Sequence, residues 1–312
     1  MPPGNSASPM AGSFRLFRVG GITVSVHWSW LLVAAFELQY RAGEYALQFW
    51  NVAEYLALFA IVLLHEFGHA LACRSVGGRA DHIVLWPLGG VAFVAPPPRP
   101  GAWLWSIAAG PLVNVALLPI TFGALIVARG VGMEATNPDV DHFLVALRDI
   151  NLILLLFNLL PVYPLDGGQI LQALLWFVIG RVKSLLVVSV IGLAVAAVAI
   201  VVALAYREIW FVVMAGFVAL RSWAGFRFAR ALAAAEAIPR RPEVACPNCG
   251  AHPPAGNFWT CGRCRTQFDI FARGHACPNC GERFDVAGCP ACGQGHPLST
   301  WLVDGGGPAR ER

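Results

Sequence analysis

The chain has 312 residues, of which 57% are hydrophobic and only 13% are charged. Soluble globular chains carry about 25% charged residues, so the composition argues against an ordinary soluble protein and indicates a membrane protein. The formal net charge of +4 is modest, and no long basic block argues for a nucleic-acid partner.

The N-terminal residues 1–13 are rich in Pro, Gly and Ser, and we expect them to be disordered. They contain no basic stretch followed by a short apolar stretch and a small-residue cleavage site, so they do not resemble a removable signal peptide. We therefore expect the first membrane helix to direct the chain to the membrane.

Apolar runs dominate the sequence up to about residue 226. A helix needs about 20 apolar residues to cross the hydrocarbon core of a bilayer, and six stretches approach this length. They are residues 22–36, 53–73, 103–128, 150–165, 184–205 and 209–226. Residues 170–179 are apolar but too short, and they follow a Pro/Gly break, which favours a re-entrant piece or a continuation.

Most Arg and Lys residues that flank these spans fall on one side of the membrane if the N-terminus is cytosolic. We therefore expect a multi-pass protein of the cell membrane with both termini in the cytoplasm. Between the second and third spans, residues 83–94 read IVLWPLGGVAFV. The β-branched residues on either side of a Pro-Leu-Gly-Gly turn predict a short membrane-associated β-hairpin.

The sharpest motif is HEFGH, residues 65–69. His65 and His69 lie four residues apart, share one face of a helix and can present two imidazoles to one metal ion. Glu66 lies beside them and is placed to take a proton from a metal-activated water. The motif follows the apolar run LALFAIVLL, where each ionisable group costs about 2.5–3.5 kcal/mol on insertion scales. A bound cation would compensate for this cost. The alternative is that the motif lies at a helix end, with its side chains among the lipid headgroups.

A catalytic zinc takes three protein ligands and leaves one position open. Asp166 is the best third candidate, because it is the only carboxylate between Asp149 and Glu208 and it lies in the Pro/Gly-broken stretch NLLPVYPLDG. Irregular backbone at membrane depth is tolerated where it is buried in protein or lines a water-filled cavity. The alternative is a loop carboxylate at the membrane surface.

Together, HEFGH and NLLPVYPLDGG resemble the site-2 protease family of intramembrane zinc metalloproteases. The six predicted spans and the short PLGG hairpin resemble its sporulation-factor-type branch. The resemblance extends over residues 19–230. It implies that His65, His69 and Asp166 bind a catalytic zinc, that Glu66 is the catalytic base, and that Asn158 assists at the substrate carbonyl.

The segment AGPLVN, which ends at Asn114, is also similar to a GPxxN motif of this family. From the residues alone, both asparagines are polar groups inside apolar runs that can hydrogen-bond between helices. For Asn158 a structural and a catalytic role remain open. For Asn114 the structural role is favoured, because small neighbouring residues suggest a close helix contact.

Eight of the nine cysteines form four CxxC pairs near the C-terminus. Such pairs bind metal as thiolates in a reducing compartment, which agrees with a cytosolic tail and disfavours disulfides. Two zinc ribbons are predicted, each with four cysteine ligands and a structural role. In sequential order the quartets are Cys246, Cys249, Cys261 and Cys264, then Cys277, Cys280, Cys289 and Cys292. Alternatively, the middle two pairs share one metal.

The predicted fold is an all-α polytopic membrane protein with about six transmembrane helices, a short membrane-associated β-hairpin and a small C-terminal zinc-ribbon region. The predicted segments are a disordered N-terminus (1–13), a protease domain (14–230), a linker (231–243), tandem ribbons (244–298) and a tail (299–312).

The predicted function is zinc-dependent hydrolysis of peptide bonds in or near transmembrane segments of other membrane proteins. It requires one catalytic zinc and two structural zincs, and the hairpin is expected to capture an extended substrate by strand addition. The zinc ribbons are expected to recognise a protein partner or to gate substrate access. The alternative functions are a catalytically silent membrane scaffold, which has no need of Glu66, and a zinc transporter, for which the other spans lack acidic and histidine residues.

Overall fold

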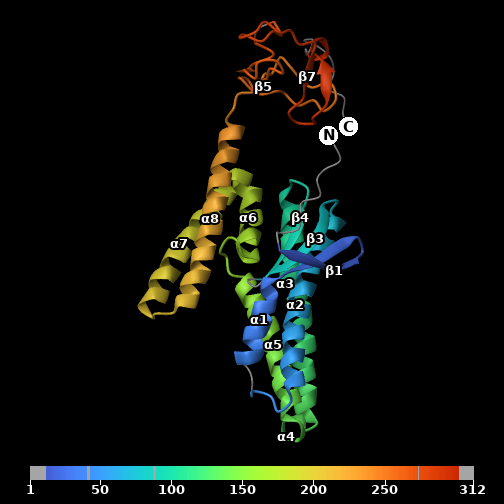
Figure 1. The fold of residues 1–312 in the computed structure, drawn as a ribbon, viewed down its shortest axis with the longest axis vertical. Coiled ribbons are helices and arrows are strands. Elements are labelled where there is room, and N and C mark those ends of the chain that lie inside the picture. Colours follow the sequence, from blue (N-terminus) through green and yellow to red (C-terminus); the bar gives the residue numbers. More distant parts are fainter. Residues whose placement is uncertain (1–11, 41–42, 87–88, 273, 302–312) are drawn as a thin grey trace. The chain divides into compact units, whose positions relative to one another are not determined.

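The computed structural model describes residues 12–40, 43–86, 89–272 and 274–301. The chain divides near residue 230 into a larger N-terminal unit and a smaller C-terminal unit. The larger unit is mostly helical and carries one small sheet (Figure 1). The sequence predicted an all-α unit with one short hairpin, whereas this unit contains a four-stranded sheet.

The sheet of the larger unit contains β1 (Ser13–Val19), β2 (Ile22–His27), β3 (Arg79–Trp86) and β4 (Gly89–Ala95). They lie in the order β1-β2-β3-β4, in which only the β2–β3 pair is parallel. The predicted hairpin over residues 83–94 is thus present as β3 and β4, within a larger sheet.

The first predicted span, residues 22–36, is wrong. Its first half is β2, and the helix α1 (Ser29–Tyr40) that follows has only 12 residues. A helix of that length rises about 18 Å, well short of the hydrocarbon thickness. The physical reason lies in the alternating β-branched sequence ITVSVH, which buries Ile22, Val24 and Val26 against the sheet core.

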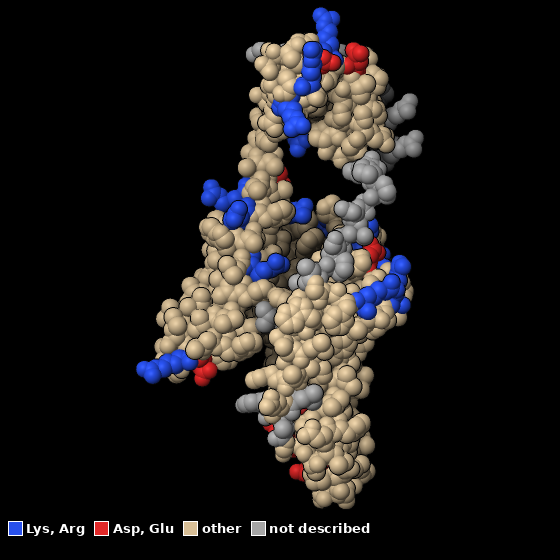
Figure 2. All heavy atoms as spheres, viewed as in Figure 1, with Lys and Arg blue, Asp and Glu red and all other residues tan. Residues whose placement is uncertain are grey.

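The remaining helices of the larger unit are α2 (Gln48–Ser75), α3 (Pro100–Gly130), α4 (Met133–Thr136), α5 (Pro138–Asn158), α6 (Asp166–Ile179), α7 (Arg181–Ala205) and α8 (Ile209–Glu236). Of the described helices, α2, α3, α7 and α8 are long and apolar enough to cross a membrane. On the face seen in Figure 2, uncharged residues cover most of the larger unit, and blue side chains gather along the upper part of α8 and at the lower end of the α7–α8 pair.

The predicted span over residues 150–165 is not one continuous helix. α5 begins earlier, at Pro138 with Asp139 and Asp141 in its first turn, and ends at Asn158. A turn over residues 159–165 then leads into α6, which has 14 residues and is too short to cross alone. The predicted count of six spans is therefore not confirmed, and the described residues contain four candidates.

α2 and α3 lie side by side (Figure 1) and are in close contact at Gly68. A Cβ atom at Gly68 would lie 2.7 Å from the carbonyl oxygen of Ala109 and 2.8 Å from Cγ2 of Val113. The sheet packs on the last turns of α2, where Ala70 and Cys73 join its buried face. The C-terminal half of α2 is thus fixed on two sides, by a helix and by a sheet.

The C-terminal unit holds two two-stranded sheets, β5 (Trp259–Thr260) with β6 (Gln267–Phe268) and β7 (Val286–Gly288) with β8 (Gly295–Pro297). Its core is small, and four of the ten buried residues in it are cysteines, which pack with residues such as Phe268 and Ile270. Trp301, only 1% exposed, belongs to this core, so the predicted tail over residues 299–312 begins inside the folded region. Residues 302–312, like 1–11, lie outside the described residues.

We predict that Gly68→Ala destabilises the protein by about 1–3 kcal/mol, because the added methyl group overpacks the α2–α3 contact. The measurement is the thermal unfolding midpoint of the purified chain in detergent. Gly123→Ala on α3 is the matched control, since a Cβ there meets nothing within 4 Å and alanine favours the helix. Equal midpoints for the two variants would contradict the close contact at Gly68.

Candidate metal centre

Three of the predicted ligands meet at one point of the larger unit. His65 and His69 lie on α2, and Asp166 is the first residue of α6. The Nε2 atoms of the two histidines lie 3.0 Å apart, and Oδ2 of Asp166 lies 3.0 Å from that of His65 and 3.3 Å from that of His69. The two imidazoles are almost fully buried, at 3% and 5% exposure, and the carboxylate is 13% exposed.

Hydrogen bonds fix the tautomer of each imidazole. Nδ1 of His69 lies 2.9 Å from the carbonyl oxygen of Ser106, which can only accept, so Nδ1 carries the proton. Nδ1 of His65 lies 2.6 Å from Oδ1 of Asn114. In a neutral ring with a protonated Nδ1, the lone pair is on Nε2, and both Nε2 atoms face Asp166.

The orientation of the Asn114 amide is fixed in turn by Asn151 on α5. The Asn151 amide donates to the backbone carbonyl of Asn114 at 3.0 Å, so its Oδ1 must accept from Asn114 Nδ2, at 2.8 Å. Oδ1 of Asn114 is therefore the atom that faces His65. Both asparagines have no exposed surface. Three helices thus determine which nitrogen of His65 is free.

The cluster fits a metal cation. Two lone pairs and a carboxylate face one another, and within the described residues Asp166 Oδ2 has no hydrogen-bond donor. Such an arrangement is repulsive unless a positive charge lies between the ligands. Zinc–nitrogen and zinc–oxygen bonds in a tetrahedral site place ligand atoms about 3.3 Å apart, close to the separations found here. Imidazole and carboxylate ligands suit zinc, and three of them leave a fourth position open.

Gly110 on α3 makes room for the two imidazoles. A Cβ atom at Gly110 would lie 2.3 Å from Nε2 of His69 and 2.8 Å from Nε2 of His65. Any larger residue at this position would therefore occupy the space between the ligands.

Glu66 is buried beside the ligand pair and contacts the edge strand β4. Its Oε2 accepts a hydrogen bond from the backbone N–H of Ala92 at 2.8 Å. Gly90 allows this contact, because a Cβ atom there would lie 2.4 Å from Oε1 of Glu66. The carboxylate is thus held next to the two predicted histidine ligands, with the backbone of an extended strand against it.

Asn158, predicted as a catalytic residue, is the last residue of α5 and is half-buried. Within the described residues its side chain makes no hydrogen bond, and its assignment stays a prediction. Sequence reasoning favoured a packing role for Asn114, whereas the structure shows it bonded to His65. It missed Asn151 altogether. The available signal was the presence of an uncharged polar residue in each of two apolar runs.

The prediction that the CxxC pairs group in sequential order is wrong. The first and fourth pairs along the chain lie together, and so do the second and third, which is the alternative in which the middle two pairs share a metal. One group is Cys246, Cys249, Cys289 and Cys292, and the other is Cys261, Cys264, Cys277 and Cys280. The two ends of the region also lie together, since Ala245 N donates to the carbonyl of Trp301 at 2.9 Å.

Both cysteine groups fit four-coordinate zinc. The shortest Sγ–Sγ separations between pairs run from 3.5 Å, for Cys264 and Cys277, to 3.8 Å, for Cys246 and Cys292. Four thiolates around a tetrahedral zinc lie about 3.8 Å apart, whereas a disulfide would bring the sulfurs to about 2.0 Å. Four thiolates fill the coordination shell, so these sites suit a structural role.

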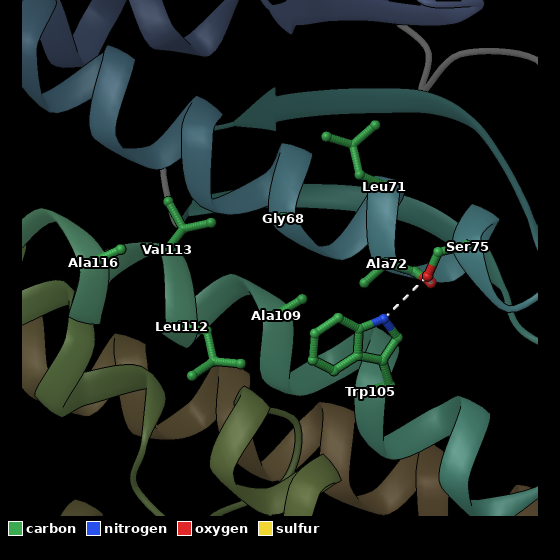
Figure 3. A pocket seen from close by; sticks show the side chains of 9 residues that line it. All are labelled: Gly68, Leu71, Ala72, Ser75, Trp105, Ala109, Leu112, Val113 and Ala116. Atoms are coloured by element: carbon green, nitrogen blue, oxygen red, sulfur yellow. Dashed lines mark hydrogen bonds between the residues drawn. The ribbon is translucent and has the colours of Figure 1, made fainter.

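A groove of about 420 Å³ also runs along α2 and α3 (Figure 3). Small and apolar residues line it, among them Gly68, Ala72 and Ala109, and the indole N–H of Trp105 donates to Ser75 Oγ at 3.1 Å. No lining residue is a carboxylate, histidine or cysteine, so the groove offers no acid–base or metal chemistry.

The chain is similar to known zinc metalloproteases. The family model described as "Peptidase family M50" matches residues 53–135 and 123–203. "Zinc metalloprotease MJ0392" of Methanocaldococcus jannaschii is 32% identical over 206 residues, covering 66% of this chain and 58% of the relative. "Putative zinc metalloprotease Rip3" of Mycobacterium tuberculosis is 36% identical over 179 residues, covering 54% of this chain and 44% of the relative.

The solved structure of the "Site-2 Protease from Methanocaldococcus jannaschii" has a TM-score of 0.51 with 28% sequence identity, and covers 69% of this chain and 95% of that one. The matched part of the chain covers 58% of the length of the Methanocaldococcus relative and 44% of the length of the Mycobacterium relative.

We predict that Asn114→Ala weakens zinc binding at the His65–His69–Asp166 cluster by about 10- to 100-fold, because His65 loses the acceptor that orients its ring. Chelator competition on the purified chain measures the affinity. Thr121→Ala on α3 is the control, since Thr121 is buried but bonds only to carbonyls of its own helix. An unchanged zinc affinity in Asn114→Ala would remove the asparagine from the site.

The nested grouping of the cysteines predicts different zinc losses for two fourfold serine variants. Replacing the outer group removes one zinc per chain, whereas replacing the first four cysteines in sequence removes two, because it breaks both groups. Metal analysis of the purified full chain gives the count. The opposite result, two zincs lost and then one, would restore the sequential arrangement. The two variants are Cys246, Cys249, Cys289 and Cys292 to Ser, and Cys246, Cys249, Cys261 and Cys264 to Ser.

Proposed function

The chain belongs to peptidase family M50, and on this premise we propose that it is a zinc-dependent endopeptidase that cuts other membrane proteins in or near their transmembrane segments. It is a multi-pass membrane protein with four helices able to cross a bilayer. The observation that carries the proposal is the position of Glu66 next to His65 and His69, with the carboxylate of Asp166 facing both imidazoles.

The ligands and the base have distinct roles in the proposed reaction. Zinc, when bound, would act as a Lewis acid and lower the pKa of its bound water to about 7. Asn114 and Ser106 hold the imidazoles with Nε2 toward the metal. Glu66 takes the proton from the attacking water and passes it to the leaving nitrogen of the peptide. Asn158 keeps its proposed role of assisting at the substrate carbonyl.

The edge strand β4 is the proposed place of substrate binding. A transmembrane helix hides its peptide bonds in internal hydrogen bonds, so the substrate must be extended before it is cut. β4 lies at the end of the sheet order, and its residue Ala92 touches Glu66. A substrate strand added beside β4 would therefore bring its peptide bonds next to the base.

The C-terminal unit is proposed to bind two structural zincs in addition to the catalytic one. Its core is so rich in cysteine that metal binding supplies much of its folding free energy. We propose that it lies in the cytoplasm together with the N-terminus, because a reducing compartment keeps the thiolates available. Recognition of a protein partner is its proposed task.

We predict that Glu66→Gln lowers cleavage by about 10²- to 10⁴-fold while leaving the zinc content unchanged, because the amide cannot take up the proton. Mass spectrometry of membrane proteins from cells with either form measures cut products within transmembrane segments. Glu134→Gln, on the exposed α4, is the control and should cut like the wild type. Identical products from the wild-type and Glu66→Gln forms would favour a membrane scaffold instead of a protease.

A further inference from the structure

The position of Asp166 depends on the turn that precedes it. The two histidines share α2, but the carboxylate comes from α6, which begins at Asp166 itself. The turn over residues 159–165 packs closely on the first turn of α6. A Cβ atom at Gly167 would lie only 2.4 Å from the carbonyl oxygens of Leu159 and Leu160. Any shift of this turn therefore moves the carboxylate relative to the imidazoles.

Helices α7 and α8 hold the turn at Tyr163, three residues before Asp166. The hydroxyl of Ser222, on α8, donates to the carbonyl oxygen of Tyr163 at 2.7 Å and is completely buried. A Cβ atom at Gly192 on α7 would lie 2.8 Å from the same carbonyl oxygen. A Cβ atom at Gly225 on α8 would lie 2.8 Å from the Tyr163 ring.

These contacts do different things to the turn. The two glycines provide the space in which Tyr163 fits, and the Ser222 hydroxyl is the group that fixes its carbonyl. Within the described residues, the other side-chain hydrogen bond to the turn comes from α6 itself, where Gln169 donates to the carbonyl of Pro164 at 3.0 Å. Ser222 is therefore the group that ties the turn to a different helix.

We propose that Ser222 is a positioning residue for the metal centre. By holding the Tyr163 carbonyl, it fixes the turn so that the Asp166 carboxylate faces His65 and His69. Without this donor the carbonyl is unpaired in apolar surroundings, and the turn shifts until another donor satisfies it. The inference rests on the proposed zinc site, since its effect is read at that zinc.

The same interface offers a matched control. Ser189, on α7, is completely buried and lies close to Gly225, where a Cβ atom would come within 2.9 Å of its hydroxyl oxygen. Within the described residues, this hydroxyl has no hydrogen-bond partner. Ser189→Ala therefore deletes a hydroxyl of the same size from the same helix contact and leaves the bond to Tyr163 intact.

The experiment measures zinc affinity of the purified full chain by chelator competition, with His65→Ala as the background in which only the cysteine groups bind. Ser222→Ala should weaken the additional zinc by about tenfold or more, and Ser189→Ala should leave it within about twofold of the wild type. Cobalt substitution, with the His65→Ala spectrum subtracted, should show altered visible absorption bands in Ser222→Ala only. Gly225→Ala, which presses on the Tyr163 ring, should shift affinity in the same direction as Ser222→Ala.

The outcomes separate the two proposals. If the wild type binds no more zinc than His65→Ala, the metal centre itself is wrong and the proposed function falls with it. If the wild type binds the additional zinc but Ser222→Ala and Ser189→Ala have equal affinities and equal cobalt spectra, the positioning role is overturned and the metal centre stands.

Discussion

The site depends on an electrostatic conflict that a bound metal cation resolves. Two imidazole nitrogens and a carboxylate oxygen face one another at 3.0–3.3 Å, and the Nδ1 hydrogen bonds leave lone pairs on the facing nitrogens. Burying such groups without a partner costs far more free energy than a protein can spare. The surrounding structure keeps these groups in place. Relief of the repulsion between them therefore contributes to the free energy of metal binding.

One face of α3 serves both histidines. Ser106, Gly110 and Asn114 are spaced by four residues, as are His65 and His69 on α2, so each set lies on a single helix face. Asn114 bonds to His65, Ser106 bonds to His69, and Gly110 leaves room for both. The earlier histidine on α2 contacts the later residue on α3, and the later histidine contacts the earlier one, so the two helices run antiparallel here. The two hydrogen bonds together fix the register of one helix against the other. A shift of either helix by a single residue would break both hydrogen bonds.

The ligands could be predicted from the sequence because their signal is local. The spacing within HEFGH and the isolated carboxylate in a broken apolar stretch are visible without a fold. Asn114 and Asn151 could not be assigned in this way, since their role comes from a contact between three helices. Ser222 gave no signal either, because a serine in an apolar helix is common in packed helix pairs.

The fold was predicted best where a single property decides it. The long apolar helices α2, α3, α7 and α8 coincide with predicted spans, because length and hydropathy suffice. Residues 22–36 were misread because apolar content alone does not separate a buried strand from a helix. The cysteine grouping failed for a different reason, since equal CxxC pairs carry no information about which pairs meet. The contact between the two ends of the region, where Ala245 N bonds to the carbonyl of Trp301, is not visible in the sequence.

The nested arrangement of the cysteines implies an order of assembly. The inner group closes a short loop, in which Cys264 and Cys277 are 13 residues apart in the sequence, whereas the outer group closes a long one, in which Cys249 and Cys289 are 40 residues apart. Closing the longer loop from an open chain costs about 1 kcal/mol more in entropy. During synthesis, the inner cysteines also emerge complete before Cys289 has been made. Once the inner loop is closed, the outer ends are already near each other, so the second ion enters a preformed site.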